Sequence, residues 1–134
     1  KIILMFTLEQ IKAAHSKVKS GADFPKYIQD LINIGVMYYH TYVIDGHAEY
    51  FGKDGYQIKS DGKYPVLNVS EKSNSETFIN RLKIHQQGQT DYMTFCNDAA
   101  ATGVEKWIVD TQNMTCTYYD LSGNMMLEEK IPTV

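Results

Sequence analysis

Hydrophobic residues recur at helical spacing through the first third of the chain. From Thr7 onward they lie three or four positions apart until Gly21, and a second set with the same spacing runs from Asp23 to Gly35. Glycine is favoured after a helix because it adopts a left-handed conformation without strain, and aspartate followed closely by Pro25 is typical of a helix start. The pattern therefore predicts two successive helices, each closed by a glycine.

Extended runs rich in β-branched and aromatic residues follow, separated by turns. The runs are Val36–Ile44, His47–Phe51, Tyr56–Lys59 and Tyr64–Val69. An Asp45-Gly46 pair is a strong signal for a two-residue hairpin turn, and such a turn would place His40 opposite Phe51. The segment predicts an antiparallel meander.

The second half of the chain repeats this order at an offset of 68 residues. The identical positions fall on helix caps, turn glycines and core aromatics, where geometry dictates the residue. The identical pairs are Ile11 with Ile79, Asp23 with Asp91, Asp30 with Asp98, Gly35 with Gly103, Val36 with Val104, Tyr50 with Tyr118 and Gly55 with Gly123. The sequence therefore predicts an internal duplication of a unit made of two helices and three strands.

The two predicted units span residues 7–69 and 75–134. Each holds about sixty residues, a size at which a core alone is marginal, so the units are expected to pack as a single domain, 1–134. We predict an α+β fold in which helices pack on antiparallel meanders and a pseudo-two-fold axis relates the halves. A capping-box pattern after Met5 makes this residue the expected natural start, with Lys1 to Leu4 an extension.

Residues that match between the halves are explained by the fold that the halves share. We therefore expect functional residues at positions that differ chemically between the halves. One face of the predicted hairpin matches the second half and is expected to point into the core. The other face is aromatic and titratable, and most of it aligns with lysine, isoleucine, aspartate and threonine in the second half. This candidate binding face consists of Tyr38, His40, Tyr42, His47, Glu49 and Phe51.

Three interpretations of this face are open. Tyrosine and histidine are good amphipathic strand residues, so the face is either simple sheet surface or the interface of a homodimer. Alternatively its rings stack on an unidentified small molecule or protein, whose polar groups the histidines and the glutamate orient. A metal site of His40, His47 and Glu49 is disfavoured because the histidines are not directly opposite, and neither a metal nor a cofactor is expected.

Other candidate residues have simpler explanations. Cys96 and Cys116 align with apolar residues and are expected to be buried free thiols. Asp30 and Asp98 lie off the apolar stripes; they would form an acid–base pair if the pseudo-two-fold axis brought them together, and would otherwise face solvent. The histidines expected on helix surfaces are His15 and His85.

Composition and charge exclude several classes of protein. A chain of 134 residues with 43% hydrophobic and 22% charged residues is an ordinary globular domain. A net charge of −3 gives no reason to bind nucleic acid, and no stretch approaches the roughly 20 apolar residues that span a bilayer. We therefore expect a cytoplasmic protein without nucleic-acid or membrane partners. Walker, GxGxxG, GxSxG and HExxH motifs are absent, so no catalytic residue is assigned.

The stretch MFTLEQIKAAHSKVKSGADFPKYIQDLINIGVMYYHTYVIDGHAEYFG, with the chain beyond it, resembles the YbcV-like family of small enterobacterial proteins. The resemblance covers essentially everything from Met5 onward and implies a phage or prophage origin. Some members carry the label "phage envelope protein". The resemblance supplies no catalytic or ligand-binding residues, because the family is uncharacterised.

Together these features favour a non-enzymatic binding or interaction protein of phage or prophage origin that acts through the candidate face. One alternative is a small acid–base enzyme that uses His40 or His47 with Glu49 in a cleft between the halves. Another is a structural component of a virion.

Overall fold

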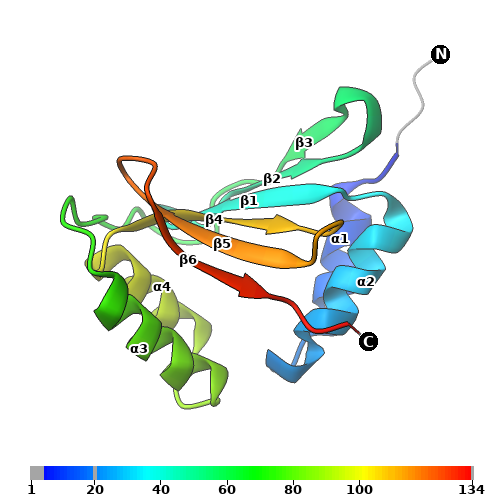
Figure 1. The fold of residues 1–134 in the computed structure, drawn as a ribbon. Helices are drawn as coiled ribbons and strands as arrows, with labels where there is room; N and C mark the ends of the chain where they lie inside the picture. The colour runs from blue at the N-terminus through cyan, green and yellow to red at the C-terminus, as the bar shows by residue number, and fades with distance from the viewer. Residues whose placement is uncertain (1–4, 20, 134) are drawn as a thin grey trace.

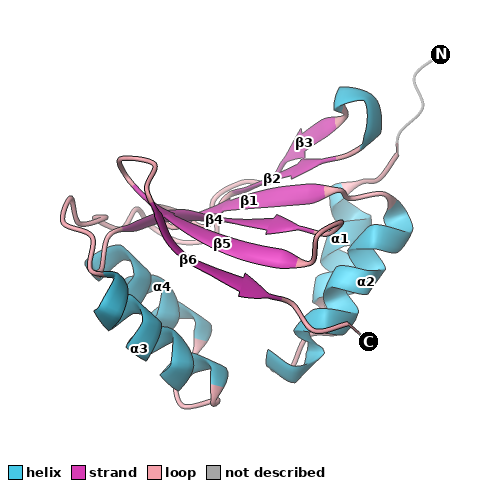
Figure 2. Cartoon of the chain, viewed as in Figure 1, coloured by secondary structure: helices cyan, strands magenta, loops and turns pink. Residues whose placement is uncertain are grey.

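The computed structural model describes residues 5–19 and 21–133, and within them the chain forms four α-helices and a six-stranded antiparallel sheet. The helices lie in two pairs on one face of the sheet, and the opposite face carries no helix of the described chain (Figures 1 and 2). The α+β class is confirmed. The expected extension, Lys1 to Leu4, lies outside the described residues.

The elements follow the predicted order of two helices and then three strands, twice over. The helices are α1 (Leu8–His15), α2 (Phe24–Ile34), α3 (Ser75–Gln86) and α4 (Tyr92–Ala101), with short 3₁₀ turns η1 (Gly21–Asp23) and η2 (Lys53–Gly55). The strands are β1 (Tyr38–Tyr42), β2 (Ala48–Phe51), β3 (Gln57–Lys59), β4 (Val104–Asp110), β5 (Thr115–Asp120) and β6 (Met125–Lys130).

The two meanders join at the centre of the sheet, where β1 pairs with β4 in the strand order β3-β2-β1-β4-β5-β6. His40 faces Ile108, the residue 68 positions later in the chain. The pairs on either side are Tyr38 with Asp110 and Tyr42 with Lys106. The register is therefore symmetric about His40 and Ile108, which is a pseudo-two-fold arrangement of the strands. The duplication of the sequence itself stays a prediction.

The first helix begins as predicted and ends earlier. Thr7 caps α1 in a reciprocal capping box, but the helix ends at His15 rather than near Gly21. Asp23 precedes α2, yet its carboxylate accepts a hydrogen bond from the backbone N–H of Lys19 (2.8 Å) and does not cap the helix. The backbone of Asp23 is already helical, so its side chain is not directed at the first turn of α2.

The β1–β2 hairpin forms, but its predicted register is wrong by two residues. His40 lies opposite Glu49 rather than Phe51. The turn holds four residues instead of two, because the backbone N–H of Tyr42 donates to the carbonyl of His47 (3.0 Å). A shift of two residues leaves every side chain on its predicted face.

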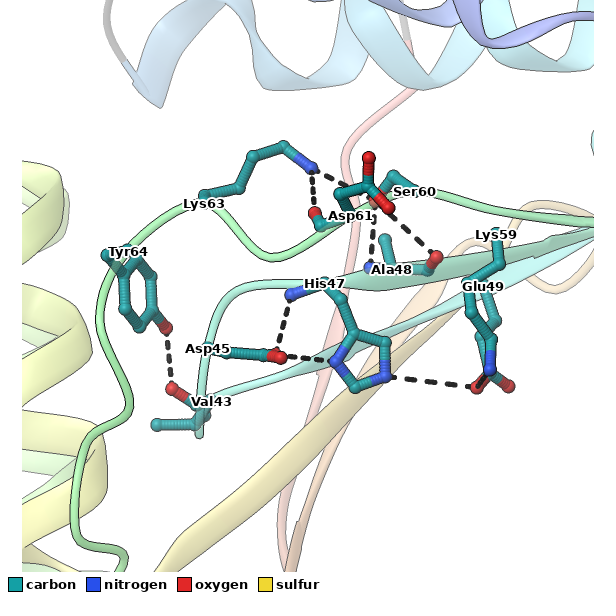
Figure 3. A network of polar contacts seen from close by, with 10 residues as sticks. All are labelled: Val43, Asp45, His47, Ala48, Glu49, Lys59, Ser60, Asp61, Lys63 and Tyr64. Carbon is teal, nitrogen blue, oxygen red and sulfur yellow. Dashed lines mark hydrogen bonds and ion pairs between the residues drawn. The ribbon is translucent and has the colours of Figure 1, made fainter.

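The predicted strand Tyr64–Val69 does not form. Residues 60–69, called the strap below, lie across the hairpin loop instead. The hydroxyl of Tyr64 donates to the carbonyl of Val43 (2.6 Å), within the hairpin loop (Figure 3). Pro65 has no N–H to donate to a strand ladder, which favours this irregular path.

The core lies between the helices and the inner face of the sheet. The residues predicted to point inward from the first hairpin are all buried: Tyr39, Thr41, Val43, Ala48 and Tyr50. Cys96 and Cys116 are buried free thiols, as predicted. Burial raises the pKa of Cys116 to about 12, so this thiol is protonated and unreactive at neutral pH.

Gly46 tests the contact between the hairpin loop and the strap. Its φ of 77° strains any L residue, and an added Cβ would lie 2.7 Å from the Tyr64 ring, which a hydrogen bond to Val43 holds in place. Strain and overpacking each cost about 1–3 kcal/mol, so Gly46→Ala should lower the free energy of unfolding by at least about 2 kcal/mol in urea titrations.

The matched control for this substitution is Gly55→Ala. Gly55 has nearly the same φ of 78°, but nothing lies within 4 Å of an added Cβ. This variant should therefore lose only the share due to backbone strain. Equal losses in the two variants would contradict a tight contact between Gly46 and the strap.

Candidate functional site

The six predicted site residues lie together on the sheet face on which no helix of the described residues packs, which we call the outer face. Alternation along β1 and β2, and pairing between them, bring these side chains to one surface. They are Tyr38, His40, Tyr42, His47, Glu49 and Phe51. The Tyr38 side chain is 39% exposed, and the other five residues are partly buried by one another and by their neighbours.

Two stacked ring pairs flank His40 on this face. The rings of Tyr38 and Phe51 stack with centroids 4.5 Å apart, and those of Tyr42 and His47 stack at the same separation. The His40 ring lies between the pairs, 5.2 Å from Phe51 and 6.3 Å from Tyr42. The face is therefore a continuous ring surface with an imidazole at its centre.

The surroundings of His40 favour its neutral form. Its Nδ1 is shielded from solvent and has no hydrogen-bond partner in the part of the chain that the structure describes. Burial lowers the pKa of His40 below the ordinary 6.5, the charge of Lys106 lowers it further, and Glu49 opposes the shift. Because an N–H at the shielded Nδ1 would find no acceptor, the single proton of the neutral ring belongs on Nε2.

Asp45 orients the second histidine of the outer face (Figure 3). One oxygen of its carboxylate accepts hydrogen bonds from the backbone N–H of His47 (3.0 Å) and from the ring Nδ1 (2.5 Å). Burial acts to raise the pKa of Asp45, but these hydrogen bonds outweigh it and lower the pKa. The ring Nε2 lies 3.9 Å from Glu49, which in turn lies 3.7 Å from Nζ of Lys59.

A lysine–serine pair that was not predicted lies beside this network (Figure 3). Nζ of Lys63 donates to Oγ of Ser60 (2.9 Å), while burial and the charge of Lys12 lower the pKa of Lys63. The same Oγ accepts from the backbone N–H of Ala48 (3.0 Å), and Ser60 is only 6% exposed. A covered serine bonded to the backbone fastens the strap to β2 and is not placed to act as a nucleophile.

The two helical aspartates do not form an acid–base pair. Asp30 on α2 pairs with Lys26 on the same helix. Asp98 on α4 pairs with Arg81 of α3 (2.9 Å). The α1–α2 and α3–α4 pairs lie under opposite ends of the sheet, so the pseudo-two-fold arrangement keeps these carboxylates apart (Figure 1).

The two helical histidines differ in their surroundings. His15 is exposed, as expected. His85 is partly buried: it stacks on Phe95 with centroids 4.6 Å apart, and its Nδ1 lies 3.1 Å from the carbonyl of Thr90. The expectation was wrong for His85 because the turn that joins α3 to α4 folds back over it.

The acid–base interpretation requires a cleft lined by its proposed catalytic side chains, but the two depressions described next have other linings. Two surface depressions, of about 450 and 420 Å³, lie beside the Tyr42 end of the outer face. Neither is lined by His40, His47 or Glu49. Within residues 5–19 and 21–133, no group of three or more His, Cys, Asp or Glu side chains is arranged to hold a metal ion.

Glu105 lines both depressions and was not among the predicted residues. It is the extra residue of a β-bulge in β4, between Val104 and Lys106. Bulges redirect side chains and are common beside functional sites. Glu105 aligns with Met37 at the offset of 68, so the comparison of halves that selected the outer face contained the signal for this residue as well.

Comparison with known proteins places the chain in a class whose function is not assigned. The family model described as "Protein of unknown function (DUF1398)" matches residues 12–130, and the chain belongs to this family. The uncharacterized protein YcgX of Escherichia coli K12 is 19% identical over 115 residues, which cover 86% of each chain.

Mycobacterial relatives match over a shorter stretch. The uncharacterized protein Mb2035 of Mycobacterium bovis is 36% identical over 50 residues, 37% of this chain and 30% of that protein, and Rv2012 of Mycobacterium tuberculosis matches to the same extent.

In the described residues, no helix combines the length and apolar character required to cross a membrane.

Replacing Lys106 tests the electrostatic part of the His40 environment. In Lys106→Gln the NMR titration midpoint of the His40 ring should rise, because one of the charges that lowers its pKa is gone. It should still lie below 6.5, since burial of the ring persists. Lys130→Gln, at an exposed position of β6, is the control and should leave the midpoint unchanged. A wild-type midpoint at or above 6.5 would contradict the lowered pKa of His40.

Proposed function

We propose that this protein is a non-enzymatic binding protein that holds a small planar molecule on the outer face. The observation that carries the proposal is the neutral His40 ring between two stacked aromatic pairs, on a sheet face that carries no helix. Each favourable ring stack contributes about 0.5–1.5 kcal/mol beyond burial, so a flat ring lying over several side chains gains enough for selective binding.

The chemistry of the face defines the ligand class. With its proton on Nε2, His40 donates a hydrogen bond, so the ligand should carry an acceptor such as a carbonyl oxygen or a ring nitrogen. Tyr38 and Phe51 offer the most exposed stacked pair beside it. Glu49 and Lys59 at the margin are already close to each other, which favours a neutral ligand over an ion.

An acid–base enzyme is the second candidate, favoured by one observation. Asp45 orients His47 through its Nδ1, which is how carboxylates position catalytic imidazoles. However, the depressions beside the face do not include His47, and Ser60, the serine beside this network, is buried. We therefore favour binding over catalysis.

We also propose that the protein derives from a phage or prophage and acts in the cytoplasm. The resemblance of the segment from Met5 onward to the YbcV-like family supports this origin. The interpretation as a structural virion component rests on the same resemblance. A homodimer that covers the outer face is the competing explanation for its aromatic character.

The proposal is tested with 2-quinolone, a planar neutral lactam, and its saturated counterpart octahydro-2-quinolone. The planar compound should bind more tightly, and NMR shift changes should map to Tyr38, His40 and Phe51. Removing one stack in Tyr38→Leu should weaken binding by about twofold to tenfold. Tyr119→Leu, on the same face but on β5, is the matched control.

Two results would overturn the proposal. One is equal binding of the planar and saturated compounds, because stacking would then contribute nothing. The other is a dimer in light scattering that dissociates in Tyr38→Leu, because a second copy would then occupy the face.

A further inference from the structure

An apolar trough adjoins the outer face, and Tyr42 is the one residue of the six-residue candidate face that also lines it. The two depressions adjoin at Glu105 and Leu121, which line both, and together they reach from the strap to Tyr119 of β5. Its strap end is walled by Val66, Leu67 and Val69 together with Ile44 of the hairpin loop. Three of the apolar side chains are well exposed: Ile44 at 42%, Val66 at 73% and Leu121 at 45%.

The carboxylate of Glu105 is the acidic group in this hollow. The bulge fixes its backbone, whose carbonyl accepts a hydrogen bond from the N–H of Val43 (2.9 Å). Within the described chain, the carboxylate itself makes no hydrogen bond or ion pair. Lys106 also lines the second depression, but its Nζ lies over the Tyr42 ring, 5.6 Å from the centroid, and makes no ion pair with Glu105 in the described chain.

An unpaired carboxylate among apolar walls is complementary to a cation that carries an apolar chain. Partial desolvation by the walls strengthens attraction to an opposite charge and disfavours anions. The Tyr42 ring, which lines the first depression, already attracts one ammonium group. A volume of about 450 Å³ lies in the range of small-molecule sites.

We propose that the trough binds a small alkylammonium ion, with its chain against Ile44, Val66 and Leu121 and its charged group beside Glu105. This site shares Tyr42 with the ring surface of the outer face but does not include Tyr38, His40 or Phe51. It does not depend on the binding of a planar molecule there.

The proposal is tested by NMR titration of the full chain with butyl-, hexyl- and octylammonium at pH 7, below micelle formation. Octylammonium should bind the half-open hollow with a dissociation constant of about millimolar, and each methylene removed should weaken binding by about twofold to fourfold. Octanoate, of equal chain length and opposite charge, should bind at least about tenfold more weakly. Shift changes should map to the strap and to the Glu105 bulge.

Two variants separate the charge from the apolar walls. Glu105→Gln should remove the preference for octylammonium over octanoate, whereas Glu76→Gln on α3 should keep it. Leu121→Ser should weaken both compounds by a similar factor. The proposal fails if octanoate binds as tightly as octylammonium, if Glu105→Gln keeps the preference, or if the wild type shows no saturable binding. Because the outer face has its own probe, 2-quinolone, failure at the trough leaves that site untouched.

Discussion

The antiparallel pairing of β1 with β4 is the contact on which the rest of the structure depends. Each half alone consists of two helices and a short meander, a size at which a hydrophobic core is only marginally stable. The central pair joins the two meanders into one sheet and brings Tyr39 and Trp107 to the same inner face, where both are buried. Both helix pairs then cover that inner face (Figure 1). The outer face is bare as a direct consequence, and its central residue, His40, is also the centre of the register.

The polar groups of the candidate sites are concentrated where the regular strands are interrupted. The hairpin loop, the strap and the β4 bulge meet at one end, where the N–H of Val43 bonds to the carbonyl of Glu105 (2.9 Å). The loop also places Asp45 against His47, and the bulge directs Glu105 into the trough. A sheet of ideal strands would offer neither carboxylate in these positions. The ring surface and the trough are therefore neighbouring sites on one scaffold, and they meet at Tyr42.

Local signals in the sequence predict the order of the helices and the faces of the first hairpin correctly, although α1 ends earlier than the pattern indicates. Gly35 ends α2 with a φ of 103°, and the alternation along β1 assigns Tyr38 to the surface and Tyr39 to the core. The predicted register is wrong by two residues because Tyr42 and His47 close a four-residue turn, and the strap and β4 hold this wider loop through bonds that the Asp45-Gly46 dipeptide does not reveal. The apolar run from Tyr64 to Val69 predicts a strand, because an apolar run alone does not reveal which partners its backbone N–H and C=O groups bond to. The pattern of hydrophobic residues does not reveal the bulge at Glu105. The chemical difference between Glu105 and Met37, which align at the offset of 68, does mark this position.

The most direct test of this account is solvent paramagnetic relaxation enhancement, measured by NMR on the free protein with a soluble gadolinium chelate. It reports which side chains solvent reaches, and the account requires an uncovered outer face beside a buried inner face. The enhancement should alternate along β1, strong at the exposed Tyr38 ring and weak at the buried Tyr39 ring. Equal protection of Tyr38 and Tyr39 would mean that another chain or segment covers the outer face, and would contradict the assignment of this surface as a binding site.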